Sequence, residues 1–131
     1  MVKEWIDKIT EVYTTEGLSS VIQSLNNSLE FKLICELFEI PEDILEKYAN
    51  SFGWYRISKY QVLSEKFIET HKYEVNWLEV VKRQKMSVPF IENHIQYIIP
   101  YFDEMVQNPF ISEMSISYIR EKYNIQPDKS Y

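Results

Sequence analysis

A tandem repeat is the feature that most limits what this chain can fold into. When residues 54–76 are placed over residues 77–99, eight columns are identical, far more than chance would give. The matched pairs are Trp54/Trp77, Lys59/Lys82, Gln61/Gln84, Ser64/Ser87, Phe67/Phe90, Ile68/Ile91, Glu69/Glu92 and His71/His94. A repeat this short is one small structural unit that has to stack on its neighbours, so a repeat array is expected.

Further copies flank these two units. Residues 31–53 keep the apolar pattern of a repeat, and residues 1–30 carry apolar residues at helical spacing, which is typical of N-terminal cap helices. A degenerate fourth copy is expected at residues 114–119, with Met114 at the position that Met86 holds in the third unit. Together with a C-terminal tail it would account for residues 100–131. We therefore expect one helical domain over residues 1–131.

Each unit has the pattern of two short helices. Trp54, Ile57 and Tyr60 follow one another at the spacing of a single helix face. Ser64 then has the side chain of a helix N-cap, and Phe67 begins the apolar face of a second helix. The sequence therefore predicts a helix–turn–helix pair in every repeat.

Pairs this small cannot bury their apolar faces alone, so the copies should stack side by side. In such a stack we expect Trp54 near Trp77 and Phe67 near Phe90. With only 2 Gly residues in the chain, a fold built from many tight turns between strands is disfavoured. The predicted fold class is all-α, with short helix pairs stacked as a small α-solenoid-like array.

Residues 54–68 follow the pattern W-x-x-I-S-x-Y-Q-x-L-S-E-x-F-I, and Val75, Asn76 and Trp77 lead into the next copy. This pattern resembles a tandem repeat of uncharacterised bacteriophage and large DNA virus proteins. The resemblance covers residues 31–99, and residues 100–122 weakly; the third unit departs from it with Val80, Val81 and Arg83. It implies a viral origin and a helical repeat, and it supplies no catalytic residues.

Charge is distributed unevenly along the chain, whose formal net charge is -6. Residues 1–53 are acidic and residues 54–91 are basic, and the overall negative charge counts against a protein whose main role is to grip nucleic-acid phosphates.

The sequence predicts a cytoplasmic location, in an infected host cell. It has a single cysteine, no signal-peptide pattern at the N-terminus and no long apolar run.

Residues that could carry chemistry have more ordinary interpretations. His71 and His94 occupy equivalent repeat positions without a Cys partner, so a structural role is favoured over a metal site. Cys35 lies on an apolar helix, which is typical of a buried thiol. Gln61 and Gln84 are expected to hydrogen-bond an inter-helix turn rather than a nucleotide base. We expect no enzyme, metal or cofactor.

The function predicted is therefore non-enzymatic protein binding, by a viral inhibitor of a host defence protein such as a CRISPR or restriction nuclease. The array also allows a homodimer, whereas membrane association is not expected. The residues predicted to contact the partner are Glu36, Glu39, Glu42, Asp43, Glu46, Arg56, Lys59 and Tyr55.

Two other functions stay open. The first is nucleic-acid binding by the basic middle of the chain, and the second is self-assembly as a structural viral protein. The basic residues concerned are Arg56, Lys59, Lys82, Arg83 and Lys85.

Overall fold

The computed structural model describes residues 2–126, which form helices and contain no strand. The all-α prediction is confirmed. The helices are α1 (Val2–Glu16), α2 (Leu18–Gln23), α3 (Ser28–Leu37), α4 (Glu42–Lys47), α5 (Ala49–Phe52), α6 (Trp54–Tyr60), α7 (Glu65–Thr70), α8 (Trp77–Arg83), α9 (Val88–Asn93), α10 (Ile95–Ile98), the 3₁₀ helix η1 (Ile99–Gln107) and α11 (Glu113–Lys122). Within residues 2–126, none of these is both long enough and apolar enough to cross a bilayer.

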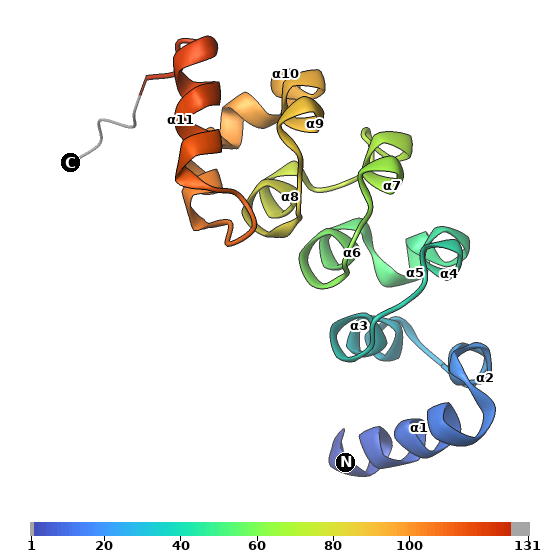
Figure 1. Ribbon diagram of the computed structural model, residues 1–131. Helices are drawn as coiled ribbons and strands as arrows, with labels where there is room; N and C mark the ends of the chain where they lie inside the picture. The colour runs from blue at the N-terminus through green and yellow to red at the C-terminus, as the bar shows by residue number, and fades with distance from the viewer. Residues whose placement is uncertain (1, 127–131) are drawn as a thin grey trace.

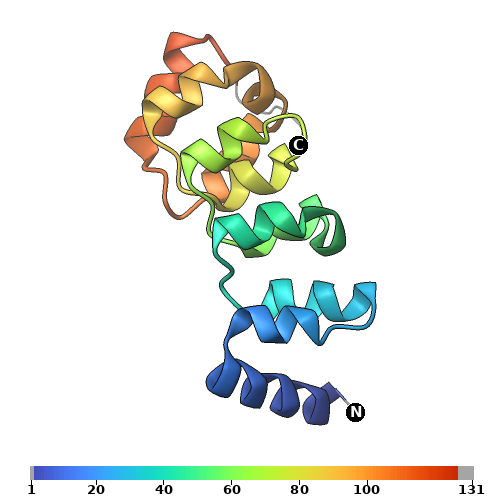
Figure 2. The same cartoon turned by 90° about the vertical axis from the view of Figure 1, so that its right-hand side faces the viewer.

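The helices lie in two rows that follow the order of the chain (Figure 1). One row, the inner row, contains α3, α6 and α8, and in it α3 packs on α6, α6 on α8, and α8 on η1. The other, the outer row, contains α4 with α5, then α7, then α9 with α10. Figure 1 shows that the stack bends, with α3, α6 and α8 on its inner side. In Figure 2 successive pairs lie one above another from the N-terminal to the C-terminal end.

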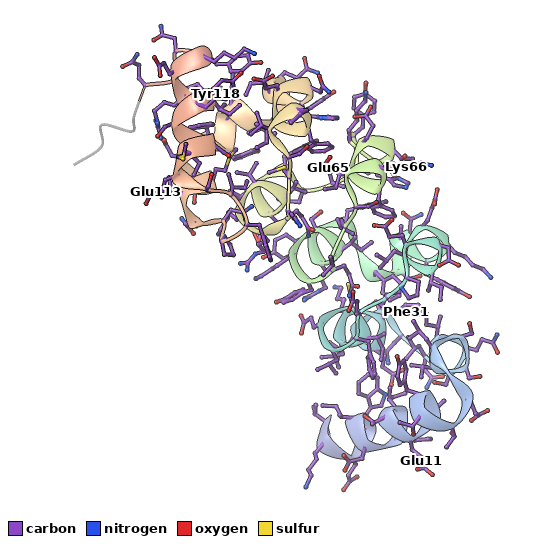
Figure 3. All side chains as sticks on the ribbon, viewed as in Figure 1. Glu11, Phe31, Glu65, Lys66, Glu113 and Tyr118 are labelled. Carbon is purple, nitrogen blue, oxygen red and sulfur yellow. The ribbon has the colours of Figure 1, made fainter. Side chains whose placement is uncertain are left out.

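Two columns of apolar side chains run through the stack at equivalent repeat positions. The inner-row helices contribute a fully buried aliphatic side chain at the same position of each repeat, as do the outer-row helices. These side chains are Ile34, Ile57 and Val80 in the inner row and Leu45, Ile68 and Ile91 in the outer row. Figure 3 shows Phe31 in the space between the rows, whereas Glu11 points away from the stack. The apolar positions of successive repeats therefore form one continuous core.

The serine caps predicted from the sequence are confirmed. The Ser64 side chain accepts a hydrogen bond from the Phe67 N–H, and the Ser87 side chain accepts one from the Phe90 N–H. Each cap provides an acceptor for an N–H group that the first turn of a helix leaves without an intrahelical partner.

The fourth copy begins earlier than the sequence indicated. Ser112 is the N-cap of α11 and Ile111 before it is buried, so Ile111 and Ser112 correspond to Met86 and Ser87 of the third unit. Met114, which was expected at the Met86 position, is 84% exposed, whereas Met86 is 5% exposed. The expected alignment of residues 114–119 is therefore wrong, because Ile111 rather than Met114 occupies the buried position before the cap.

The tryptophans also pack differently from the expectation. The ring of Trp54 contacts His71 and Phe67, with centroids 4.9 and 6.0 Å apart, and the ring of Trp77 contacts His94 at 5.9 Å. Each tryptophan thus packs on the second helix of its own unit. The tryptophan rings therefore pack within their own helix pair, and the indole N–H of Trp77 also donates to the Lys72 carbonyl of the preceding repeat at 2.9 Å.

A ladder of buried amide side chains joins each repeat to the one before it. The Gln61 side chain donates to the carbonyls of Cys35 and Phe38, at 2.6 and 2.8 Å, and accepts from the Ile40 N–H at 2.8 Å. Phe38 and Ile40 lie where α3 has ended and α4 has not begun, so these backbone groups have no partner within a helix. Gln61 supplies those partners from the next repeat.

Gln84 repeats this arrangement one unit later. It donates to the carbonyls of Ser58 and Gln61, at 2.9 and 2.7 Å, and accepts from the Leu63 N–H at 3.0 Å. Asn108 continues the ladder, with its side-chain amide donating to the carbonyls of Val81 and Gln84 at 2.9 and 2.8 Å. The glutamines do bond an inter-helix turn, as predicted, but it is the turn of the preceding repeat.

Replacing a ladder amide should destabilise the stack strongly. Gln84→Leu keeps the side chain buried but leaves three backbone groups without partners, so we expect the free energy of unfolding to fall by about 3 kcal/mol or more. Urea unfolding followed by circular dichroism measures this change. The control, Gln96→Leu on an exposed position of α10, should change stability by no more than about 0.5 kcal/mol. A loss at Gln84 no larger than at Gln96 would contradict the ladder.

Candidate partner-binding surface

Several of the carboxylates predicted to contact a partner instead hold the stack together. The Ser64 N–H and hydroxyl donate to the Glu42 carboxylate at 2.6 and 2.9 Å. One repeat later, the Ser87 N–H and hydroxyl donate to Glu65 at 2.6 and 3.2 Å. Each carboxylate thereby binds the beginning of the next outer-row helix, where the positive end of the helix dipole favours a negative charge. Glu42 is therefore a structural residue.

A second set of carboxylate contacts runs along the same row. Glu46 lies 3.6 Å from His71, and one repeat later Glu69 pairs with His94. At the equivalent position of the third repeat, Glu92 lies 3.0 Å from Lys122. The pKa of Glu69 is lowered, first by its hydrogen bond with His94 and then by Lys72.

The two histidines lie in packed positions rather than in a metal site. The His94 ring is buried, stacks on Phe90 with centroids 4.1 Å apart, and its Nδ1 lies 2.8 Å from the Phe90 carbonyl. Among residues 2–126, no group of three or more potential ligands lies close enough together to hold a metal ion. His94 therefore makes an inter-repeat contact through Glu69, whereas the His71 ring hydrogen-bonds Glu74 of its own unit at 3.1 Å.

The five acidic residues predicted as one binding surface are divided by the structure. Glu36 on α3 pairs with Arg56 on α6, while Glu42 and Glu46 are engaged in the contacts described above. Within residues 2–126, the side chains of Glu39 and Asp43 are exposed and make no hydrogen bond or ion pair. Of the predicted acidic set, these two carboxylates are the ones without a contact to another side chain or backbone group in the described part of the chain.

The other predicted contact residues, Tyr55 and Lys59, belong to a surface on the inner row that we call the cationic patch. It is formed by α6, α8 and the loop after η1, and comprises Tyr55, Lys59, Tyr60, Lys82, Arg83 and Phe110. Its lysines occupy the same position in successive repeats, so the repeat itself places two positive charges side by side.

Lys59 is oriented by aromatic rings. Its Nζ donates to the Tyr55 hydroxyl at 3.3 Å and lies 5.5 and 5.2 Å from the ring centroids of Tyr55 and Tyr60. The Tyr55 hydrogen bond is the main reason that the pKa of Lys59 is raised. Lys59 is therefore a fixed positive charge near neutral pH.

Phe110 and Tyr60 are the members of the patch that sequence reasoning missed; Tyr60 was expected on the helix face of Trp54 and Ile57 but is 42% exposed.

Phe110 lies at the other end of the patch. Its ring is 61% exposed, and it lines a hollow of about 350 Å³ with Lys59, Lys82, Arg83, Gln107 and Pro109. The repeat spacing beyond residue 99 is irregular, so Phe110 could not be aligned with the basic residues of α6 and α8. An aromatic residue next to Pro109 was the signal available in the sequence.

Cys35 does not have the surroundings of a nucleophile. Its side chain is completely buried on α3, and this burial raises the pKa of the thiol to about 11. At neutral pH the thiol is therefore protonated, whereas the thiolate is the reactive form.

Comparisons of this chain with protein-family models, with curated proteins and with solved structures found no match. The similarity to a viral repeat therefore stays a prediction from the sequence pattern.

The pair of Glu69 and His94 should make the stability of the protein depend on pH. Because the folded-state pKa of Glu69 lies below its ordinary value of 4.5, its contribution is present above that pH and is lost as the pH falls through the folded-state value. Glu69→Gln should therefore destabilise the protein at neutral pH, and the difference from the wild type should shrink as the pH falls below 4.5. Thermal unfolding of both proteins across pH measures this difference. A difference that grows below pH 4.5 would contradict the prediction.

The Cys35 thiol should react with a disulfide reagent only when the protein unfolds. In native buffer at neutral pH we expect the reaction to be limited by opening of the structure, and in denaturant we expect one thiol to react at once. Absorbance of the released thiolate measures both rates. Immediate reaction in native buffer would show that α3 does not bury the thiol.

Proposed function

We propose that this chain is a non-enzymatic protein-binding module. The observation that carries the proposal is a contrast between two groups of polar side chains. The carboxylates, histidines and amides best suited to catalysis bridge neighbouring repeats, whereas Glu39, Asp43 and the cationic patch face outward without such bridging contacts. A helical stack of this kind offers an extended surface for recognition.

The specific form of the proposal is a viral inhibitor that binds a host defence protein such as a CRISPR or restriction nuclease. Its support is the repeat pattern of residues 54–68 together with the exposed carboxylates of Glu39 and Asp43. Nucleic-acid-handling proteins carry basic grooves, and exposed carboxylates are complementary to such a groove.

Affinity capture with a matched pair of charge-reversal variants tests this function. Tagged wild-type protein is incubated with a lysate of a candidate bacterial host, and the bound proteins are identified by mass spectrometry. We expect one stoichiometric partner with a basic nucleic-acid groove, and we expect the double variant Glu39→Lys/Asp43→Lys to lose it. Glu42 and Glu46 are left unchanged because their substitution would disturb the stack itself.

The control variant is Glu11→Lys/Glu16→Lys, which changes the net charge by the same amount on exposed positions of α1. It should retain the partner. Retention by both variants would show that Glu39 and Asp43 do not form the contact, and recovery of this protein alone, as an oligomer, would replace the inhibitor proposal with self-assembly.

A further inference from the structure

Lys59 and Lys82, the repeated lysines of the cationic patch, differ from the repeated carboxylates in having no partner in the next unit within residues 2–126. Glu42, Glu65, Glu69 and Glu92 each reach a side chain or backbone group of the following repeat. Within residues 2–126, neither Lys59 nor Lys82 makes an ion pair. A repeated residue without a role between repeats indicates a role at the surface.

The charge of the patch is only partly compensated by its surroundings. Arg83 is held by the buried carboxylate of Glu79, with its Nε 3.1 Å from Oε1, whereas the two lysines pair with no carboxylate in the part of the chain that the structure describes. The hollow that these three cations line therefore carries net positive charge on a chain whose total charge is -6. Such a local field attracts an anionic group.

The patch also exposes apolar surface. Phe110 is 61% exposed at the edge of the hollow, and Tyr60, whose ring lies against Lys59, is 42% exposed. The volume of about 350 Å³ falls within the usual range for ligand pockets. Aromatic rings beside cations suit a ligand that carries apolar side chains next to negative charges, because burial of the rings adds to the electrostatic attraction.

We infer that the cationic patch binds an acidic linear segment of a partner protein. Carboxylates of the segment pair with Lys59, Lys82 and Arg83, and a large apolar side chain occupies the hollow against Phe110. This inference deepens the proposed protein-binding function, on which it rests, and places a contact on the inner row, away from Glu39 and Asp43.

A peptide is a better fit than a nucleic acid for two reasons. A polyphosphate chain needs many cations in a row to give stable binding in physiological salt, and the patch offers three that line one hollow. The net charge of -6 also repels a polyanion at long range, whereas a short segment with a few carboxylates meets mainly the local positive field.

Selection from a library of short random peptides tests the inference. Immobilised wild-type protein and the variant Lys59→Glu/Lys82→Glu are exposed to the same library. We expect peptides rich in Asp and Glu with at least one aromatic or large aliphatic residue to be enriched on the wild type and not on the variant. Enrichment without an acidic bias, or the same enrichment on both proteins, would overturn the inference.

The affinity of the best enriched peptide is then measured by fluorescence anisotropy. Reversing both lysines should weaken it about tenfold or more, because like charges now face the carboxylates. The control, Lys47→Glu/Lys66→Glu, makes the same charge change on exposed positions of α4 and α7 in the outer row and should bind as the wild type does. Phe110→Ala should weaken binding while leaving its salt dependence unchanged.

A labelled oligo-dT strand is the competing probe. We expect its binding to be weaker than that of the peptide at about 50 mM salt and undetectable at about 200 mM, where phosphate contacts are lost steeply. Tighter binding of oligo-dT than of the peptide would overturn the inference in favour of a nucleic-acid site.

The Glu39→Lys/Asp43→Lys variant distinguishes this inference from the host-protein contact. It should bind the peptide normally even where it loses a captured host protein. Conversely, if capture fails while the acidic peptide binds through Lys59 and Lys82, the inhibitor proposal fails and the peptide site stands.

Discussion

The hydrogen bonds of the buried amides Gln61, Gln84 and Asn108 are the interaction on which the rest of the structure depends. A short helix that ends in extended backbone leaves carbonyl and N–H groups without intrahelical partners, and burying them unsatisfied would cost a large part of the stability of a small protein. In this chain the missing partner comes from the next repeat, so the turn of one unit is complete only when its successor is folded against it.

This dependence explains how chemistry-bearing residues are distributed between core and surface. Apolar columns such as Ile34, Ile57 and Val80 drive the stacking, and the amides and carboxylates set its register by bonding specific backbone groups. Once these polar groups are engaged, Glu39, Asp43 and the cationic patch are among the exposed groups that can serve recognition.

Much of the fold could be predicted from the repeat, whereas the surfaces could not. Identical residues at equivalent positions of successive units predicted the helix pairs, the serine caps and a structural role for Gln61. The fourth copy was misplaced because Asn108 replaces glutamine and added residues change the spacing. The acidic stretch looked continuous in the chain, but the partners of Glu42 and Glu46 lie one repeat later, at Ser64 and His71. The equal spacing of Glu42/Ser64 and Glu65/Ser87 was the overlooked signal.

The central claim is that the amide ladder protects linker backbone between helices, and native-state hydrogen exchange of the Ile40 and Leu63 amides tests it most directly. Both N–H groups lie outside the helices and donate to a buried glutamine side chain. We predict that both exchange as slowly as amides inside α6 and α8, while the neighbouring amides of Glu39 and Val62 exchange quickly. If Ile40 and Leu63 exchange as fast as those neighbours, the ladder does not hold the repeats together.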